Sequence, residues 1–383
     1  MSVRRRTWTV NGEQREAWVA DYVDQNGNRH IKTFPRRRDA ESFHAVARVE
    51  VAKGIHTADR RSPTIAEAGE LWIQSSAGLE RSTLHSYRGH LRLHISPLIG
   101  HVRLSQLTAP MVRAFEDRLG ATRSPAMVRK VLVSLGAIVA DALDRGLVAQ
   151  NVVRGRSRKP TRHGESRKRK LEIGADIPTP AEIRALILHL DKYRRWRALF
   201  LLAAFAGLRS SELRGLYRDD VNLRHAEVTV RRRADRYNVI GAPKSSAGTR
   251  TIPLLPMVVN ALREHMLTTK RSTSNLMFPS KTGHIIGYSN LMKFAWKPLQ
   301  IEAGVVDARG RAKYPGLHAL RHFFASWCIN RRIDGGLELP LKLVSSRLGH
   351  ASIQITADRY GHLFPRGDDS AELMAAERAF LGG

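Results

Sequence analysis

The first fifty residues change from a strand-like to a helix-like pattern of apolar positions. Apolar residues lie two positions apart over residues 8–10 and again over residues 18–22, a period typical of half-buried β-strands. The sequence Asp-Gln-Asn-Gly at 24–27 predicts a tight hairpin turn, because an Asn-Gly pair supplies the positive φ angles that such a turn needs. Residues 31–34 predict a third strand.

A helix is predicted next, over residues 37–53. Its apolar side chains recur at helical spacing, namely Ala40, Phe43, Ala47 and Val51, and Gly54 is a typical helix stop. Three strands and one helix make a small module, residues 1–56. The module either folds separately or packs as an N-terminal sheet on the main domain, and the break at Ser62-Pro63 favours a separate unit.

Residues 64–153 have a helical pattern throughout. Thr108 and Ser124 stand at N-cap positions, and each is followed within two residues by a proline, as at the start of many helices. A long apolar stripe runs through residues 126–147. We therefore expect a compact bundle of about four helices over residues 63–155.

A strongly basic segment follows this bundle. Eight of the fifteen residues from Arg156 to Lys170 are Lys or Arg, and only Glu165 is acidic. Like charges keep such a segment extended, so residues 156–175 are interpreted as a linker that either lies along a phosphate backbone or is simply solvated. Further basic blocks, which indicate several contact surfaces, are residues 4–6, 36–38 and 231–233.

Residues 176–383 predict a mainly helical domain with a small antiparallel sheet. Thr179 and Glu182 form a capping-box sequence around Pro180, which marks a helix start. Helices are predicted over residues 180–190, 195–206, 210–216, 257–266, 288–303, 318–331, 341–348 and 352–359. Strands are predicted over 226–231 and 249–254, with a turn at 242–248 near the tip of their connection. The predicted fold class is multidomain and mainly α, with a three-stranded β plus helix module, a helical bundle and a mixed, mainly helical domain.

Composition narrows the class of protein. Lys and Arg number 64 against 35 Asp and Glu, so the formal net charge is +29, which favours a nucleic-acid partner. The longest apolar run has 11 residues, Ala198 to Leu208, about half of what a membrane span needs. No secretory signal is visible, and the single cysteine, Cys328, excludes an internal disulfide. We expect a soluble intracellular protein and exclude secreted, membrane-spanning and zinc-finger proteins.

No general motif for nucleotide or metal chemistry is present. The sequence has no phosphate-binding glycine loop ending in Lys-Ser/Thr, no His-Glu-x-x-His and no acidic cluster for two-metal nuclease chemistry. If the chain performs phosphodiester chemistry, fixed cations must therefore replace magnesium. Candidate groups stand near predicted helix ends, namely Arg209, His318, Arg321, His350 and Tyr360. Singly, each is more typical of a salt bridge or of packing than of a site.

Together, these residues resemble the tyrosine recombinases, or phage-type integrases. The matching boxes are 206–213 (AGLRSSEL, first arginine), 243–254 (hairpin lysine and following strand), 317–322 (LHALRH, His-x-x-Arg), 348–352 (LGHAS, Leu-Gly-His) and 355–362 (ITADRYGH, nucleophile). Five boxes occur in the family's order, and the resemblance covers the whole chain.

The resemblance implies a reaction. Tyr360 would attack a DNA phosphate, form a 3′-phosphotyrosyl link and release a 5′-hydroxyl, with no metal, ATP or other cofactor. Arg209 and Arg321 would hold the non-bridging oxygens, because guanidinium forks fit phosphate and stay charged.

The same resemblance implies how protons move. An ordinary tyrosine has a pKa near 10, so its ionisation at pH 7 costs about 4 kcal/mol unless cations or a base offset it. His318 would be the acid/base partner of the tyrosine, His350 a further donor to the phosphate, and Lys244 the general acid for the leaving 5′-oxygen. Glu212 would brace an arginine.

Some residues near the boxes are interpreted differently. Ala206 and Ala319 depart from the family, which often has Thr and Asp at these positions. These two departures bear on the fine tuning of the catalytic residues beside them rather than on the type of reaction. His322 and His362 flank the boxes and are interpreted as packing or backbone contacts. Cys328 is expected in the core.

The resemblance also implies domains and partners. Residues 1–56 would be an arm-type DNA-binding module, 63–155 a core-binding domain and 176–383 the catalytic domain. Four protomers would assemble on two DNA duplexes, with residues 370–381 docked on a neighbour or on their own domain. An accessory DNA-bending or directionality factor is a further partner, no membrane is involved, and the location is the prokaryotic cytoplasm, on DNA.

The function expected from these observations is that of an integrase of a phage or other mobile element. One alternative is a DNA-binding protein without catalysis that derives from a recombinase, although the complete set of six residues argues against it. A second is a relaxing topoisomerase with similar chemistry, which would act on DNA of any sequence.

Overall fold

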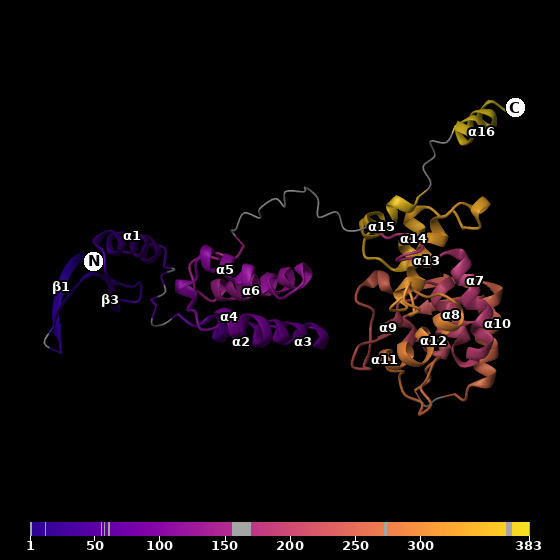
Figure 1. Cartoon of the computed structure of the whole chain (residues 1–383), viewed down its shortest axis with the longest axis horizontal. Coiled ribbons are helices and arrows are strands. Elements are labelled where there is room, and N and C mark those ends of the chain that lie inside the picture. Colours follow the sequence, from indigo (N-terminus) through magenta and orange to yellow (C-terminus); the bar gives the residue numbers. More distant parts are fainter. Residues whose placement is uncertain are drawn as a thin grey trace. The chain divides into compact units, whose positions relative to one another are not determined.

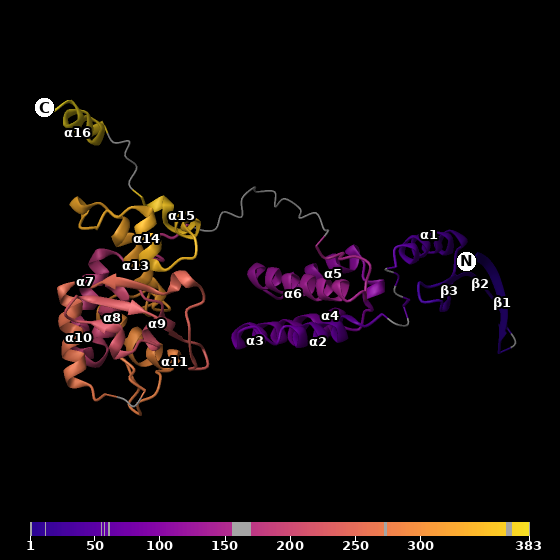
Figure 2. The same ribbon diagram turned by 180° about the vertical axis from the view of Figure 1, so that it is seen from behind.

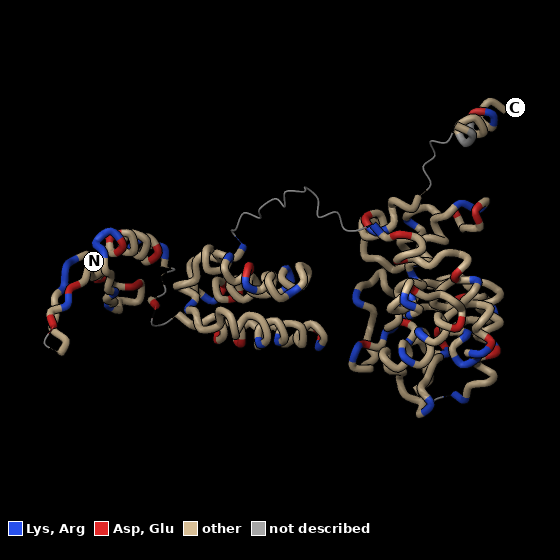
Figure 3. Tube along the Cα trace, in the orientation of Figure 1, with Lys and Arg blue, Asp and Glu red and all other residues tan. Residues whose placement is uncertain are grey.

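The computed structural model describes residues 2–382 except 12, 55, 57, 60–61, 155–169, 272–273 and 365–369. The chain divides into two compact units, Met1–Gly164 and Glu165–Gly383 (Figures 1 and 2). Most of the predicted basic linker lies outside the described residues. Within the described part of the chain, no helix is both long and apolar enough to cross a membrane. Lys and Arg are spread over both units, as the separate basic blocks predict (Figure 3).

The chain begins with a three-stranded antiparallel sheet covered by a helix. The sheet order is β1-β2-β3, and its elements are β1 (Ser2–Val10), β2 (Glu13–Val23), β3 (Arg29–Phe34) and helix α1 (Arg37–Ala52). Ala40 and Ala47 of α1 are fully buried, as are Val19 and Ala20 of β2. The predicted strands and helix are present, and β1 starts several residues earlier than predicted.

The turn between β2 and β3 differs from the tight turn that the Asn-Gly pair predicts. The Asp24 N–H donates to the Asn28 carbonyl at 2.9 Å, and Gly27 has φ +79° while Asn26 does not have a positive φ. The Asp24 carboxylate accepts the N–H groups of Asn26 and Asn28 at 2.9 and 2.8 Å. Because this side chain satisfies the turn's donors, one left-handed residue is sufficient.

A helical bundle follows in the same unit. Its helices are α2 (Ile65–Ser75), α3 (Arg81–His90), α4 (Ser96–Ile99), α5 (Ala109–Gly120) and α6 (Pro125–Asp144), with a π-helical turn at Leu91–Ile95 between α3 and α4. The predicted caps are confirmed, since the hydroxyls of Thr108 and Ser124 accept the N–H groups of Met111 and Met127. The bundle encloses its own core, with Ile65, Leu135 and Ile138 fully buried.

The second unit is mainly helical. Its helices are α7 (Pro180–His189), α8 (Arg194–Phe205), α9 (Ser210–Arg214), α10 (Pro256–Thr268), α11 (Tyr288–Leu291), α12 (Lys297–Glu302), α13 (His318–Ile329), α14 (Leu341–Leu348), α15 (Ile353–Tyr360) and α16 (Ser370–Leu381). The predicted capping box of Thr179 and Glu182 is confirmed. The helix predicted over 288–303 is interrupted by a π-helical turn at Met292–Trp296.

Two small antiparallel sheets accompany these helices. One has the order β4-β5-β8, from β4 (Val221–Asn222), β5 (Glu227–Val230) and β8 (Arg250–Pro253), and the other pairs β6 (Arg233–Ala234) with β7 (Ile240–Gly241). The two predicted strands pair as β5 and β8, whereas β4 and the β6–β7 ribbon were not predicted. The tip of the connection lies at residues 235–239, where the Asp235 carboxylate accepts the N–H groups of Tyr237 and Val239. The predicted turn within 242–248 is present, since the Gly248 N–H donates to the Ser245 carbonyl at 2.9 Å, but it follows β7 and does not form the tip.

Helix α13 lies between two groups of buried side chains. Leu320 and Phe323 belong to the main core of the unit. Phe324 and Cys328 belong to a second group that α13 forms with α14 and α15, and this group includes Tyr360. Apolar packing therefore holds α13, α14 and α15 together, and the polar residues at 318, 321 and 322 project from a helix that is fixed on both sides.

Candidate active site

Arg209 and Glu212 form the first part of the site. Arg209 is the N-cap of α9, and its backbone N–H and its Nη1 donate to the two Glu212 carboxylate oxygens at 2.8 and 2.7 Å. Both hydrogen bonds run from Arg209 to the Glu212 carboxylate, and together they fix the start of the helix. The Glu212 side chain is 2% exposed, whereas that of Arg209 is 36% exposed, so Arg209 has a free side from which to meet a ligand.

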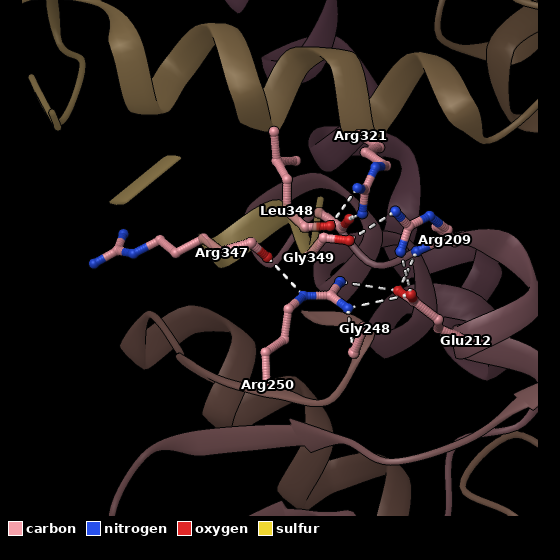
Figure 4. Close-up of polar contacts among 9 residues, drawn as sticks. Arg209, Glu212, Gly248, Arg250, Arg321, Arg347, Leu348 and Gly349 are labelled. Carbon is pink, nitrogen blue, oxygen red and sulfur yellow. Dashed lines mark hydrogen bonds and ion pairs between the residues drawn. The ribbon is translucent and has the colours of Figure 1, made fainter. Parts of the chain in front are cut away.

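Arg250 joins the same carboxylate from the sheet. Its Nη1 and Nη2 donate to Glu212 at 3.2 and 2.9 Å, and its Nε donates to the Arg347 carbonyl at 2.7 Å. Figure 4 shows the guanidinium groups of Arg209 and Arg250 converging on Glu212. No role for Arg250 was predicted from the sequence. The sign that could have identified it is an arginine at an inward position of a predicted strand. Arg250 and Ile252 are both buried, whereas Thr251 is exposed.

Arg321 ties the separate boxes together. Its side chain is almost completely buried, and its guanidinium donates to the Gly207 carbonyl at 2.7 Å and to the Leu348 carbonyl (Figure 4). These two contacts connect α13 to the turn before α9 and to the end of α14. Three of its five N–H groups remain for other acceptors beyond these two contacts.

Two glycines permit this close approach. Gly207 has φ +62°, and a Cβ there would meet the Phe324 ring at 2.3 Å. Gly349 ends α14 with φ +62°, and a Cβ there would lie 2.8 Å from Arg250 Nη1. The Gly349 carbonyl also accepts Arg209 Nη2 at 3.1 Å. A side chain at Gly207 would therefore displace the Phe324 ring of α13, and one at Gly349 would displace the Arg250 guanidinium.

The charges in this cluster do not cancel. Burial works to raise the pKa of Glu212, but the Arg250 ion pair and the charges of Arg321 and Arg209 outweigh it and lower the pKa to about 2. Burial lowers the pKa of Arg321 to about 9, so it stays charged at neutral pH. Three guanidinium groups thus surround one carboxylate, and the cluster keeps two positive charges. Such a site suits a phosphate whose negative charge grows during reaction.

The predicted catalytic histidines, His318 and His350, are both neutral. Burial, with a smaller contribution from Arg321, lowers the pKa of each to about 4. His350 Nδ1 lies 2.8 Å from the Thr356 hydroxyl of α15. If that hydroxyl donates, the ring proton sits on Nε2 and is available to a ligand.

Tyr360 ends α15 and is 2% exposed. Its phenol oxygen lies 2.7 Å from His322 Nδ1. His318 was expected beside the tyrosine, but the phenol oxygen contacts His322, whose ring centroid is 4.5 Å from that of His318. His322 was interpreted as a packing residue, although its i+4 spacing from His318 places the two on one helix face. His362 does make the expected backbone contact, to the Leu171 carbonyl at 2.8 Å.

Burial raises the pKa of Tyr360, while the positive charges of Arg321, Arg359 and Arg209 act against that rise. The phenol is therefore protonated at rest. Burial also raises the pKa of the Cys328 thiol to about 12, and its side chain is fully buried. Cys328 is a core residue, as expected.

Lys244 stands on the segment that leads from β7 to β8. It is exposed, between β7 and the 3₁₀ turn Ser246–Gly248. That turn contacts the site, because the Gly248 carbonyl accepts Arg250 Nη1 at 2.9 Å. The structure thus brings Arg209, His318, Arg321, His350 and Tyr360 to one region of the fold and places Lys244 on a segment that borders it. Among the residues that are described, no group of three or more His, Cys, Asp or Glu could hold a metal ion.

Guanidinium groups, neutral imidazoles and a buried tyrosine are the residue types that suit phosphoryl transfer through a tyrosine. The comparison with protein families makes this class specific. Residues 178–366 match the phage integrase family, and this part of the chain is a member of that family of tyrosine recombinases.

Curated relatives cover nearly the whole chain. A "tyrosine recombinase XerC-like" protein of Caldanaerobacter subterraneus subsp. tengcongensis is 27% identical over 374 residues, which span 90% of each chain. The "putative prophage phiRv2 integrase" of Mycobacterium tuberculosis is 27% identical over 374 residues, 94% of this chain and 92% of the relative.

Solved structures share the fold. The Tn1549 transposon integrase, in complex with a circular intermediate DNA, superposes with a TM-score of 0.67 at 16% identity, over 83% of this chain and 100% of the other. A lambda integrase tetramer bound to a Holliday junction gives a TM-score of 0.56 at 16% identity, over 90% and 95% of the two chains. The predicted fold class is confirmed.

Proposed function

We propose that this protein is a site-specific DNA recombinase, the integrase of a phage or other mobile element, which breaks and rejoins DNA through a 3′-phosphotyrosyl intermediate at Tyr360. Family membership and the relatives named as integrases support this function. The observation that carries it is the arginine cluster with an excess of two positive charges, in the same packed unit as a buried tyrosine.

Arg209 and Arg321 bind the non-bridging oxygens of the scissile phosphate. Arg209 is partly exposed and is held in place by Glu212, and Arg321 is fixed by two backbone carbonyls. Both are therefore organised before the substrate arrives. Preorganised donors of this kind are each worth on the order of a hundredfold in rate. Because Tyr360 is buried at rest, binding of DNA must also uncover the phenol oxygen.

Protons move with the phosphoryl transfer. The Tyr360 O–H bond breaks as its oxygen bonds to phosphorus, and the neutral imidazole of His318 has a lone pair that accepts the proton. The bond from phosphorus to the 5′-oxygen then breaks, and Lys244 protonates that oxygen. His350 donates to a phosphate oxygen. The energy of the bond is retained in the phosphotyrosine, so a second 5′-hydroxyl reverses the reaction without ATP.

The partner is double-stranded DNA at an attachment site, and four protomers act together. Helix α16 supports an exchange between protomers, because Leu373, Met374 and Phe380 are 57%, 52% and 89% exposed. Docking on a neighbour would cover them. Docking of α16 on its own domain would also cover these side chains. An accessory DNA-bending or directionality factor is a further member of the expected assembly.

The function is tested by strand joining on DNA with and without the attachment site, in the presence of EDTA. We expect covalent adducts and joined products to form with EDTA and only on the cognate site, because fixed cations hold the phosphate. Loss of joining in EDTA would show that a metal acts. Equal activity on unrelated DNA would indicate a relaxing topoisomerase, and binding without adducts a DNA-binding protein that lacks catalysis.

The N-terminal module gives a second prediction. We expect removal of residues 1–56 to spare cleavage of the core site and to impair full integration, because the sheet and α1 would contact a separate, distal class of sites. Core cleavage is measured on short duplexes and integration on a plasmid that carries the complete attachment region. Equal integration by the truncated and full chains would refute this role.

A further inference from the structure

His322 is a buried titratable group in direct contact with the nucleophile, and the mechanism above does not use it. Its ring is 6% exposed. One ring nitrogen, Nδ1, lies 2.7 Å from the Tyr360 phenol oxygen, and the other, Nε2, lies 3.5 Å from Arg359 Nη2. The side chains of Tyr360, His322 and Arg359 therefore form a chain of hydrogen bonds, in which His322 of α13 lies between two residues of α15.

The chemistry of Arg359 determines which ring nitrogen carries the proton. A guanidinium has N–H groups and no acceptor, whereas a neutral imidazole has one N–H and one lone pair. Burial, with smaller contributions from His318, Arg359 and Arg321, lowers the pKa of His322 to about 3, so the ring is neutral. An Nε2 that accepts from Arg359 leaves the ring proton on Nδ1.

We infer that His322 donates a hydrogen bond from Nδ1 to the Tyr360 phenol oxygen, and that Arg359 is a positioning residue that fixes this tautomer. The inference rests on the proposed function of Tyr360. A donor to the phenol oxygen orients the nucleophile at rest and stabilises the negative charge that develops on this oxygen as its proton leaves. His322 cannot itself take that proton, since its Nδ1 is already protonated.

The opposite assignment makes a different prediction. If His322 were the general base, its Nδ1 lone pair would accept from the phenol and Nε2 would carry the proton. An N–H would then face the N–H groups of Arg359, an arrangement that no hydrogen bond stabilises. The two assignments differ in one observable, the protonated ring nitrogen.

The first test is a measurement of this tautomer on the full chain without DNA. Nitrogen-15 NMR of histidine-labelled protein distinguishes protonated from unprotonated ring nitrogens, and a His322→Asn variant identifies the signal. We expect Nδ1 to be protonated and Arg359→Met to move the proton toward Nε2, while Arg332→Met, at an exposed arginine of the 3₁₀ turn Arg332–Asp334, leaves it in place. A proton on Nε2 in the unaltered protein would overturn the inference. This result is independent of recombination, so it is separate from any failure of the proposed function.

The second test measures single-turnover formation of the covalent adduct on a nicked attachment-site substrate. The Asn amide N–H can replace Nδ1–H as a donor but cannot act as a base. We therefore expect His322→Asn to stay within about tenfold of the unaltered rate and His322→Ala to lose on the order of a hundredfold, whereas His225→Ala, at an exposed histidine, leaves the rate unchanged. If the Asn and Ala variants are equally slow, although both fold, donation from Nδ1 is not what the reaction needs.

Discussion

Replacement of Tyr360 by phenylalanine is expected to abolish covalent attachment of the protein to DNA while leaving attachment-site binding within about twofold. The substitution removes one oxygen from a side chain packed among α13, α14 and α15, so the ring keeps its contacts and only the nucleophile is lost. The measurement is denaturing electrophoresis of adducts trapped on nicked substrates, beside a binding assay on the same DNA.

A matched control is Tyr288→Phe, since Tyr288 is 39% exposed and lies in α11. This variant is expected to form adducts at the unaltered rate. Adducts that persist in Tyr360→Phe, or a trapped peptide whose DNA linkage maps to another residue, would refute the assignment of Tyr360 as nucleophile.

Replacement of Glu212 by alanine is expected to lower the free energy of unfolding of the C-terminal unit by about 3–5 kcal/mol, because it leaves buried arginine charge without its partner. The carboxylate accepts from both Arg209 and Arg250 at the centre of the site, so strand cleavage should fall as well. Urea unfolding of the full chain measures the effect. The control is Asp191, a partner of Arg197 whose own side chain is 78% exposed. We expect Asp191→Asn to lower the free energy of unfolding by less than about 1 kcal/mol.

The stabilisation by Glu212 depends on pH in a defined direction. Its folded-state pKa of about 2 is below its ordinary value of 4.5, so the contribution is complete above pH 4.5 and is lost as the pH falls toward 2. The difference in unfolding free energy between the unaltered protein and Glu212→Gln should therefore be constant from pH 6 to 8 and should narrow below pH 4.5. A difference that grows on acidification would contradict the ion-pair explanation.

Local features of the fold followed from the sequence with few corrections. The capping box at Thr179 and the caps at Thr108 and Ser124 were predicted and are present, because a cap needs only residues within one helical turn. The hairpin after β2 was placed correctly, but its type was wrong, since the Asp24 side chain replaces part of the backbone bonding. The β6–β7 ribbon was missed because two-residue strands have too few residues for a period to be visible.

The order of the boxes and the residue types in them are properties of the sequence alone. They were sufficient to identify the family and to nominate Arg209, Lys244, His318, Arg321, His350 and Tyr360. What each side chain touches depends on pairs that are far apart along the chain, such as Arg209 with Gly349 and Arg321 with Gly207. No periodicity or cap encodes such pairs, since they form only when helices that are distant in sequence pack together.

Two assignments therefore came from the tertiary structure. It placed His322, rather than His318, in hydrogen-bond contact with the phenol oxygen of Tyr360, and it brought Arg250 from β8 onto Glu212. The residue types alone determine which functional groups this protein can use, because functional groups are properties of side chains. The protonation states and partners of those groups were decided by burial and by the fields of neighbouring charges, which exist only in the folded chain.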